Sequence, residues 1–169
     1  MLTLDAPAGV APRLVIAIGN PSRGDDALGP LLAERLEALR MPGVEVLTDY
    51  QLQIEYALDL HGREEVIFVD ASVKGEAPFT FEAIAPGGDA SVTTHALSPQ
   101  ALLAGFAKLT GEAPPRAYVL AVRGQAFELG EGLSAQALAN LEAGWAALRA
   151  RLARRPRTAR TETTSTSGT

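Results

Sequence analysis

The stretch LVIAIGNPSRGDDALGP, residues 14–30, decides what kind of fold this chain adopts. Residues 14–18 form an apolar run with the length of a buried strand. A turn of small residues follows, and two adjacent carboxylates, Asp25 and Asp26, then stand at the start of a helical pattern. A buried strand that leads through a short turn into a helix is typical of α/β folds.

The same alternation of apolar runs and helical patterns continues along the chain. Phe79 to Ile84 has the period-2 pattern of a more exposed, edge strand. Ser98 and Ser134 are placed to cap the helices that follow them. The pattern predicts a parallel sheet with crossover helices. The predicted strands are residues 14–18, 44–47, 66–69, 79–84 and 118–122, and the predicted helices are approximately residues 27–40, 51–60, 99–109 and 135–152.

Length and composition predict one compact domain. The chain has 169 residues, of which 47% are hydrophobic and 5% aromatic, so its core is expected to consist mainly of aliphatic side chains. We expect the folded domain to span residues 13–152. Residues 1–12 are predicted to be a flexible N-terminus and residues 153–169 a disordered tail, because neither has apolar periodicity.

Charge and residue content exclude several classes of function. The net charge is -5 and residues 1–147 contain no Lys/Arg-rich block, which argues against nucleic acid as a partner. With no cysteine, a metal would have to be held by carboxylate, imidazole or backbone oxygen. The sequence has neither a secretory signal pattern nor an apolar run of membrane-spanning length, so we predict a cytoplasmic protein with no membrane partner.

Three residues that follow predicted strands or precede a capped helix are candidates for chemistry: Asp26, Asp70 and His95. In an open parallel sheet, ligands bind beyond the carboxyl ends of the strands. Two carboxylates and one imidazole on neighbouring loops would form an oxygen, oxygen, nitrogen set for a divalent transition metal such as nickel or zinc.

Each of these residues also has a structural interpretation. Asp25 or Asp26 alone is explained by helix capping, which suits Asp25 better and leaves Asp26 free to point over the strand ends. Asp70 could be a carboxylate that binds loop amides, and a lone His95 would usually be structural. Asn20 and Arg23 could contact substrate, although Asn20 is equally suited to the turn.

Other chemistries have less support in the sequence. A thiol nucleophile is excluded, and neither a nucleophile-elbow pattern nor HExxH occurs. Gly19, Gly24 and Gly29 are spaced five apart, which matches neither the dinucleotide fingerprint nor a P-loop. We therefore expect no nucleotide cofactor, and a small nucleotide-binding regulator is the weakest alternative.

The chain resembles the hydrogenase maturation endopeptidases through three motifs in the same order. They are LVIAIGNPSRGDDALGP, VIFVDAS at residues 66–72 and TTHALSP at residues 93–99. The segment VRGQAFELGEGLS, residues 122–134, is also similar to this family between its last strand and last helix. The resemblance covers approximately residues 13–150.

This resemblance implies an α/β domain of three layers, with a twisted, mostly parallel sheet of about five strands flanked by helices on both faces. It implies that Asp26, Asp70 and His95 form the metal and catalytic site, with Asp26 standing where members of the family often have Glu. The family removes a short C-terminal extension from the large subunit of nickel-iron hydrogenases after the metal centre is loaded. The implied partner is that precursor subunit, and the implied nickel is supplied by it.

The resulting hypothesis is that Asp26, Asp70 and His95 engage nickel in the immature subunit and hold the scissile peptide in the crevice, where water attacks. One of the carboxylates could instead be the general base, and the sequence leaves that open. The main alternative is an assembly chaperone that uses the same three residues to sense nickel without cleaving.

Overall fold

The computed structural model describes residues 9–88 and 97–154 of the chain. Most of the predicted flexible ends therefore lies outside the described residues. Helices and strands alternate along the described part in the order expected for crossover connections. In chain order the elements are β1 (Arg13–Ile18), the 3-10 helix η1 (Gly24–Ala27), α1 (Leu28–Leu39), β2 (Val44–Asp49), the 3-10 helix η2 (Ile54–Leu60), β3 (Glu65–Ser72), β4 (Phe79–Ile84), α2 (Pro99–Thr110), β5 (Arg116–Arg123) and α3 (Ala135–Ala153).

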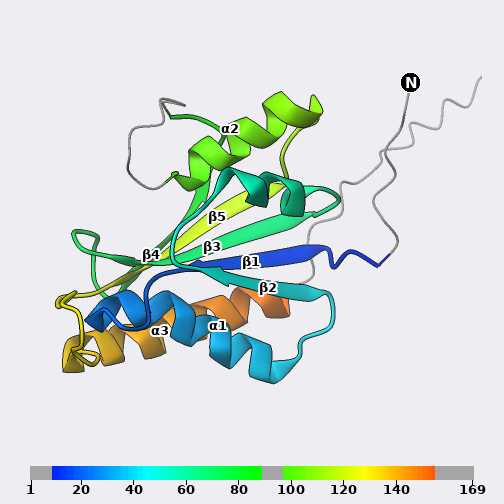
Figure 1. The fold of residues 1–169 in the computed structure, drawn as a ribbon. Helices are drawn as coiled ribbons and strands as arrows, with labels where there is room; N and C mark the ends of the chain where they lie inside the picture. Colours follow the sequence, from blue (N-terminus) through cyan, green and yellow to red (C-terminus); the bar gives the residue numbers. More distant parts are fainter. Residues whose placement is uncertain (1–8, 89–96, 155–169) are drawn as a thin grey trace, which may run out of the picture.

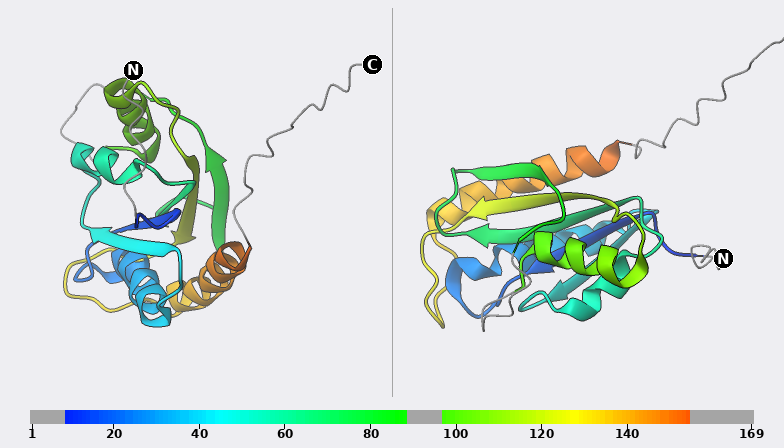
Figure 2. Two further views of the ribbon diagram at one scale, coloured as in Figure 1. Left: turned by 90° about the vertical axis from the view of Figure 1, so that its right-hand side faces the viewer. Right: turned by 90° about the horizontal axis from the view of Figure 1, so that it is seen from above.

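The strands form one five-stranded sheet in the order β2-β1-β3-β5-β4. The pairs β1·β2, β1·β3 and β3·β5 are parallel, and β4 pairs antiparallel with β5 at the edge of the sheet. Figure 2 shows the twist of this sheet between its helices. The prediction of a mostly parallel sheet with residues 79–84 as an edge strand is confirmed.

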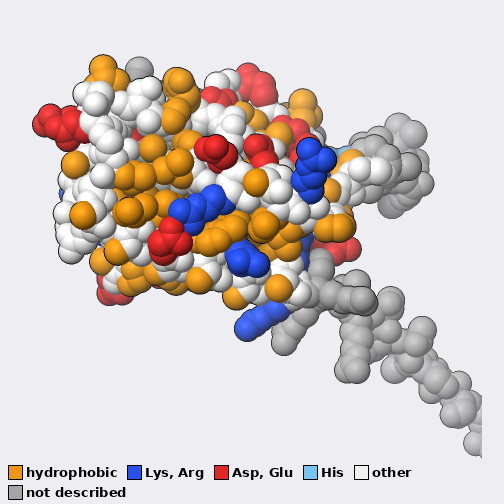
Figure 3. Space-filling model, turned by 90° about the horizontal axis from the view of Figure 1, so that it is seen from below, with side chains coloured by type: hydrophobic (Ala, Val, Ile, Leu, Met, Phe, Trp, Pro, Cys, Tyr) orange, Lys and Arg blue, Asp and Glu red, His pale blue; other side chains and the backbone are white. Residues whose placement is uncertain are grey.

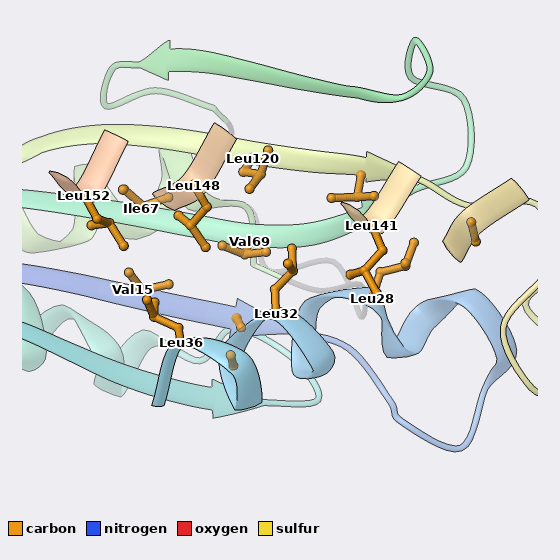
Figure 4. Close-up of a cluster of buried hydrophobic side chains, with 14 residues drawn as sticks. Val15, Leu28, Leu32, Leu36, Ile67, Val69, Leu120, Leu141, Leu148 and Leu152 are labelled. Atoms are coloured by element: carbon orange, nitrogen blue, oxygen red, sulfur yellow. The ribbon is translucent and has the colours of Figure 1, made fainter. Parts of the chain in front are cut away.

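Helices cover both faces of the sheet and make it the middle of three layers (Figure 1). Helices α1 and α3 lie on one face, and α2 and η2 lie on the other. The core on the α1 and α3 side is built almost wholly from aliphatic side chains, as Figure 4 shows. Figure 4 labels ten of these core side chains, which are Val15, Leu28, Leu32, Leu36, Ile67, Val69, Leu120, Leu141, Leu148 and Leu152. The predicted three-layer α/β domain is confirmed.

The outer surface over α1 and α3 mixes charged and apolar side chains (Figure 3). Trp145 of α3 lies between two guanidinium groups, with Arg35 6.0 Å and Arg149 5.8 Å from its ring centroid. Arg35 also pairs with Glu142 at 2.6 Å between nitrogen and oxygen. These exposed pairs contribute little to stability and indicate a solvated outer face.

The helix expected over residues 51–60 is shorter and is a 3-10 helix, η2 (Ile54–Leu60). Its buried residues, Ala57 and Leu60, are three positions apart and thus lie on one side of a helix with three residues per turn. Strand β3 is longer than expected and includes Asp70, because Asp70 and Ser72 still pair with β5. The helices capped by Ser98 and Ser134 begin as predicted. Each of these hydroxyls accepts a hydrogen bond from the backbone N–H three residues later.

A buried carboxylate fixes α3 at the amino end of the sheet. Glu65 of β3 pairs with Arg13 of β1 at 3.2 Å and also with Arg151 of α3. Arg13 donates to the carbonyl of Leu152 at 2.6 Å, and Arg151 lies 4.0 Å from the ring centroid of Tyr118. Charged side chains can be buried here because each has charged or carbonyl partners.

In the part of the chain that the structure describes, no helix is long and apolar enough to cross a bilayer.

Gly29 lets α1 begin directly above the junction of β1 and β3. A Cβ atom at this position would lie 2.4 Å from the carbonyl oxygen of Ile18 and 3.2 Å from that of Val69. Only glycine fits such a close approach of helix and strands. The first turn of α1, and with it the acidic segment η1, is thereby held against the ends of these two strands.

We predict that Gly29→Ala destabilises the protein by about 2 kcal/mol because the methyl group meets backbone that cannot move aside. Helix propensity alone would predict a gain of up to about 1 kcal/mol. Urea unfolding measures the difference. Gly132→Ala is the control, since a Cβ atom there meets nothing within 4 Å; equal stability of the two variants would contradict the prediction.

Candidate active site at the carboxyl ends of the strands

The carboxyl ends of the parallel strands meet at one edge of the sheet, where the arrowheads point in Figure 1. From β1 the chain passes through α1 to β2 on one side, and then crosses back through η2 to β3 on the other. Such a reversal opens a crevice between the two strand ends, which is the usual binding place in open α/β sheets. The segment after β1 contributes Asp26, and β3 contributes Asp70.

Asp26 is half-buried and held by its own loop. Its Oδ2 accepts a hydrogen bond from the backbone N–H of Asn20 at 2.8 Å. The Asn20 side chain accepts in turn from the N–H of Ser22 at 2.9 Å, so Asn20 has the turn role. Gly19 has a φ of +152°, and a Cβ atom there would lie 2.1 Å from the Asp26 carbonyl oxygen. The loop thus folds back tightly and fixes Asp26 at the strand ends.

Asp70 is the strongly perturbed carboxyl group of this crevice. Burial raises its pKa, the hydrogen bond from the Ala71 N–H at 2.8 Å lowers it, and the nearby negative charge of Asp26 raises it further. The resulting pKa is about 7. Asp26 and Asp70 are therefore electrostatically coupled, as expected for two carboxylates that share one site.

The pKa of Asp70 gives a prediction for stability. Since its folded-state pKa of about 7 lies above the ordinary 3.8, the folded protein binds the extra proton and loses stability as the pH rises from 4 to 7. Asp70→Asn removes this loss. We expect the variant to match the wild type at pH 4 and to be more stable at pH 8, by up to about 4 kcal/mol. Urea unfolding at both pH values is the measurement, and a pH-independent difference would contradict it.

Asp25, adjacent to Asp26, is completely buried and points away from the crevice into the segment between β5 and α3. Its carboxylate accepts hydrogen bonds from the N–H groups of Gln125, Ala126 and Ser134 at 2.7, 2.9 and 2.8 Å, and from the Ser134 hydroxyl at 2.8 Å. Burial opposes ionisation, but these four donors outweigh it and hold the pKa of Asp25 below its ordinary value. One carboxylate thus ties η1 to a segment about 100 residues away.

The expectation that Asp25 caps the helix is wrong. Neither η1 nor α1 has a side-chain cap, and the position before η1 is Arg23. The Asp25 carboxylate instead accepts four hydrogen bonds from residues 125–134. Asp25 orders the segment between β5 and α3.

Replacing Asp25 by Asn should destabilise the protein by about 3 kcal/mol at pH 7, because an amide cannot accept from four donors and its own N–H groups would face them. The difference should shrink as the pH falls below 4, where the lowered pKa of Asp25 is passed and the wild-type carboxylate becomes protonated. Guanidinium unfolding between pH 3 and pH 7 tests this. A variant with unchanged stability at pH 7 would refute the role of this carboxylate.

A groove of about 540 Å³ extends from Asp70 along the face of the sheet that carries α2. Its floor comes from alternate residues of β3, β5 and β4, and its wall from the start of α2. Most of the lining is apolar, with Asp70, Lys74 and Glu82 as its charged groups. A volume of this size is typical of ligand-binding clefts. The lining residues that sequence analysis did not single out include Leu52, Lys74, Thr80, Glu82, Gln100 and Val119.

Two of the three candidate residues, Asp26 and Asp70, lie at the crevice, whereas His95 lies outside the described residues. Among the residues that the structure describes, no three His, Asp or Glu side chains lie together in a group that could hold a metal ion. The metal set therefore stays a prediction. Nothing in the local sequence could have revealed the partners of Asp25 or the charged groove residues, because both depend on how distant strands pair.

Several solved structures similar to this chain are hydrogenase maturation proteases. The maturation protease HycI of Thermococcus kodakarensis KOD1 matches with a TM-score of 0.65 and 26% identity, over 87% of this chain and 96% of that one. The maturating endopeptidase HybD of E. coli matches with a TM-score of 0.65 and 26% identity, over 83% of this chain and 91% of that one. The chain thus has the fold of the hydrogenase maturation endopeptidases, and this similarity supports the family that the sequence motifs indicated.

These neighbours are named proteases and endopeptidases, which supports a hydrolase. The solution structure of an endopeptidase from Escherichia coli matches with a TM-score of 0.61 and 27% identity, over 83% of this chain and 91% of that one. No protein-family model matches the sequence, and no curated protein matches it by sequence. The similarity is therefore evident mainly at the level of the fold, and it extends over nearly the whole length of these relatives.

Proposed function

We propose that this protein is the endopeptidase that removes a C-terminal extension from the nickel-loaded large subunit of a nickel-iron hydrogenase. Its partner would be the precursor of that subunit. The observation that carries the proposal is the coupled pair Asp26 and Asp70 at the crevice between β1 and β3, within a chain that has the fold of this family. A perturbed carboxyl pair at the binding edge of an α/β sheet is typical of a functional site.

Asp26, Asp70 and His95 are proposed to engage the nickel of the precursor and to hold the scissile peptide against the crevice. Carboxylate and imidazole groups are suitable ligands for a divalent nickel ion. Since the metal would belong to the substrate, cleavage would depend on a correctly loaded subunit. The enzyme would need no nucleotide, and the cytoplasmic location predicted from the sequence stays a prediction.

Asp70 is also suited to accept a proton from the attacking water. A general base works best when its pKa lies near the working pH, and the pKa of Asp70 is about 7. A bound cation nearby would lower this pKa and keep the carboxylate ionised. The two roles therefore predict different pH dependences of cleavage. If Asp70 is the general base, the cleavage rate rises as the pH passes through the pKa of Asp70.

The groove beside Asp70 is the proposed place for the C-terminal extension of the substrate. It starts at Asp70 and continues between the beginning of α2 and the edge strand β4. Its apolar floor, with Phe68, Val119 and Ile84, would take apolar side chains of an extended peptide, while Lys74 and Glu82 are available for polar contacts.

Cleavage of the precursor tests the proposed function. Incubation of the nickel-loaded precursor with the wild-type protein should remove a short C-terminal peptide, and the nickel-free precursor should stay intact. Asp26→Ala, Asp70→Ala and His95→Ala should each lower kcat/KM by about 100-fold or more. Intact mass measured over time gives the rates.

The matched control is the Glu112→Ala variant. Glu112 is an exposed residue beyond the carboxyl end of α2, so this variant should cleave the precursor at the wild-type rate. Normal processing of the precursor by all three site variants would contradict the assignment of these residues to the site. A stable complex of wild-type protein and loaded precursor with no change in mass would establish the chaperone alternative instead.

A further inference from the structure

Strand β4 is the last strand in the order of the sheet, so within the described residues one of its two edges has no neighbouring strand. Figure 2 shows it at the outer side of the sheet. Its sequence, FTFEAI, is rich in aromatic and β-branched residues and contains neither proline nor lysine. Soluble proteins usually protect a free edge with such residues, because an open row of backbone groups pairs readily with another extended chain. The edge of β4 is therefore open to strand pairing.

The backbone of β4 uses alternate residues for its pairing with β5. The N–H of Arg123 donates to the carbonyl of Pro78 at 3.1 Å, so this position is a hydrogen-bonded pair of the antiparallel ladder. Such pairs recur at every second residue, which directs the backbone groups of the even-numbered residues of β4 toward β5. The residues whose N–H and C=O groups face the free edge are Phe79, Phe81 and Ala83. In residues 9–88 and 97–154, no other segment offers these groups a backbone hydrogen bond.

Each face of β4 borders a cavity. On the α2 face, Thr80, Glu82 and Ile84 line the groove of about 540 Å³ that belongs to the candidate site. On the α3 face, Phe81 and Ala83 line a second cavity of about 250 Å³. Successive side chains of a strand point to opposite faces, so a strand added at this edge would place its side chains beside the two cavities in turn. The other edge strand, β2, lines neither of these cavities.

The cavity on the α3 face is apolar with basic groups at its side. Arg151 and Arg154 line it together with Tyr118 and two alanines of α3. Arg151 is paired with Glu65 and lies 4.0 Å from the ring centroid of Tyr118, whereas Arg154 is an exposed residue directly after α3. A carboxylate suits the guanidinium group of Arg154. The two faces of β4 thus differ, because the floor of the groove on the α2 face is mostly apolar.

The register of the sheet connects this edge to the candidate site. Asp70 pairs with Ala121, and Ala121 pairs with Thr80, so these three residues form one row across the sheet. With about 4.8 Å between neighbouring strands, an added strand would lie three spacings, about 14 Å, from Asp70. An extended chain covers this distance with about four residues. A peptide that is cleaved beside Asp70 can therefore reach the free edge soon after the scissile bond.

We propose that the C-terminal extension of the precursor subunit binds as an additional strand at the free edge of β4, beginning about four residues after the scissile bond. This inference rests on the proposed function. Backbone hydrogen bonds with Phe79, Phe81 and Ala83 hold the extension in register. Its apolar side chains face the groove on the α2 side, and an acidic side chain faces Arg154 on the other side. In strand addition, backbone bonds supply affinity and the pockets for alternate side chains supply specificity.

Hydrogen exchange measures the added strand directly. The probe is the nickel-free precursor, which should stay intact, bound to the full-length protein. The amides of Phe79, Phe81 and Ala83 should exchange about 10-fold more slowly in the complex than in the free protein, because they gain hydrogen bonds. Mass spectrometry of peptide fragments that cover residues 79–84 gives the uptake. Residues 44–49, which form the opposite edge strand β2, should exchange at the same rate in both states.

Proline substitution tests the same edge through cleavage of the nickel-loaded precursor. Ala83→Pro removes an N–H that β5 does not use, and proline is tolerated at such positions of edge strands. The variant should raise KM about 10-fold with kcat nearly unchanged, because one backbone donor is lost and the site is intact. Arg154→Glu should raise KM about 5-fold, because it reverses the charge that faces the extension.

Thr48→Pro in β2 is the matched control. The N–H of Gly19 donates to the carbonyl of Asp49 at 3.1 Å, so the backbone of Asp49 faces β1 and that of Thr48 faces the other free edge of the sheet. Thr48 is exposed, as Ala83 is. This control should cleave the precursor with the wild-type KM.

Unchanged exchange of residues 79–84 in the complex, or a wild-type KM for Ala83→Pro, would overturn the added strand, and so would a wild-type dimer joined through β4. A wild-type KM for Arg154→Glu would overturn the acidic side chain of the extension. In each of these cases, cleavage by the wild-type protein would leave the proposed function intact. If the wild-type protein binds the precursor with β4 protected but never cleaves it, the proposed function fails and the added strand stands.

Discussion

The buried carboxylate of Asp25 is the interaction on which the candidate site depends. It is reached by four donors from residues 125–134, and these fix the segment between β5 and α3 to the segment between β1 and α1. Backbone N–H groups of Gly24, Asp25 and Gly130 also bond across these two irregular segments, and the carboxylate reinforces them. With it, the backbone around Asp26 is determined from both sides, and Leu129 is held beside it.

Two aspartates, Asp25 and Asp70, thus have opposite surroundings and opposite roles. Asp25 is surrounded by donors that favour its charge, whereas Asp70 across the crevice has one backbone donor and the charge of Asp26 nearby. Hydrogen bonds therefore stabilise one carboxylate as part of the framework, and the other remains energetically unsatisfied. A cation or a proton supplied by a substrate would compensate the negative charge of the Asp70 carboxylate. The same geometry therefore fits both proposed roles of Asp70.

The candidate site combines the crevice with the groove that starts at Asp70. The crevice and its groove hold the few polar groups suited to react with a peptide. The loops after β1 and β5 are held to each other by the Asp25 carboxylate, so a change in one of them also affects the other.

The sequence by itself determined the alternation of strands and helices, the edge position of residues 79–84, the helices capped by Ser98 and Ser134, and Asp26 and Asp70 as neighbours. Local periodicity, capping hydroxyls and the rule for strand ends carry that information. Only the tertiary structure decided that Asp25 binds residues 125–134 and does not cap a helix, that η2 is a 3-10 helix, and that Asp70 has a pKa of about 7. These features depend on contacts between segments far apart in the chain, and on burial, and neither leaves a periodic signal in the sequence.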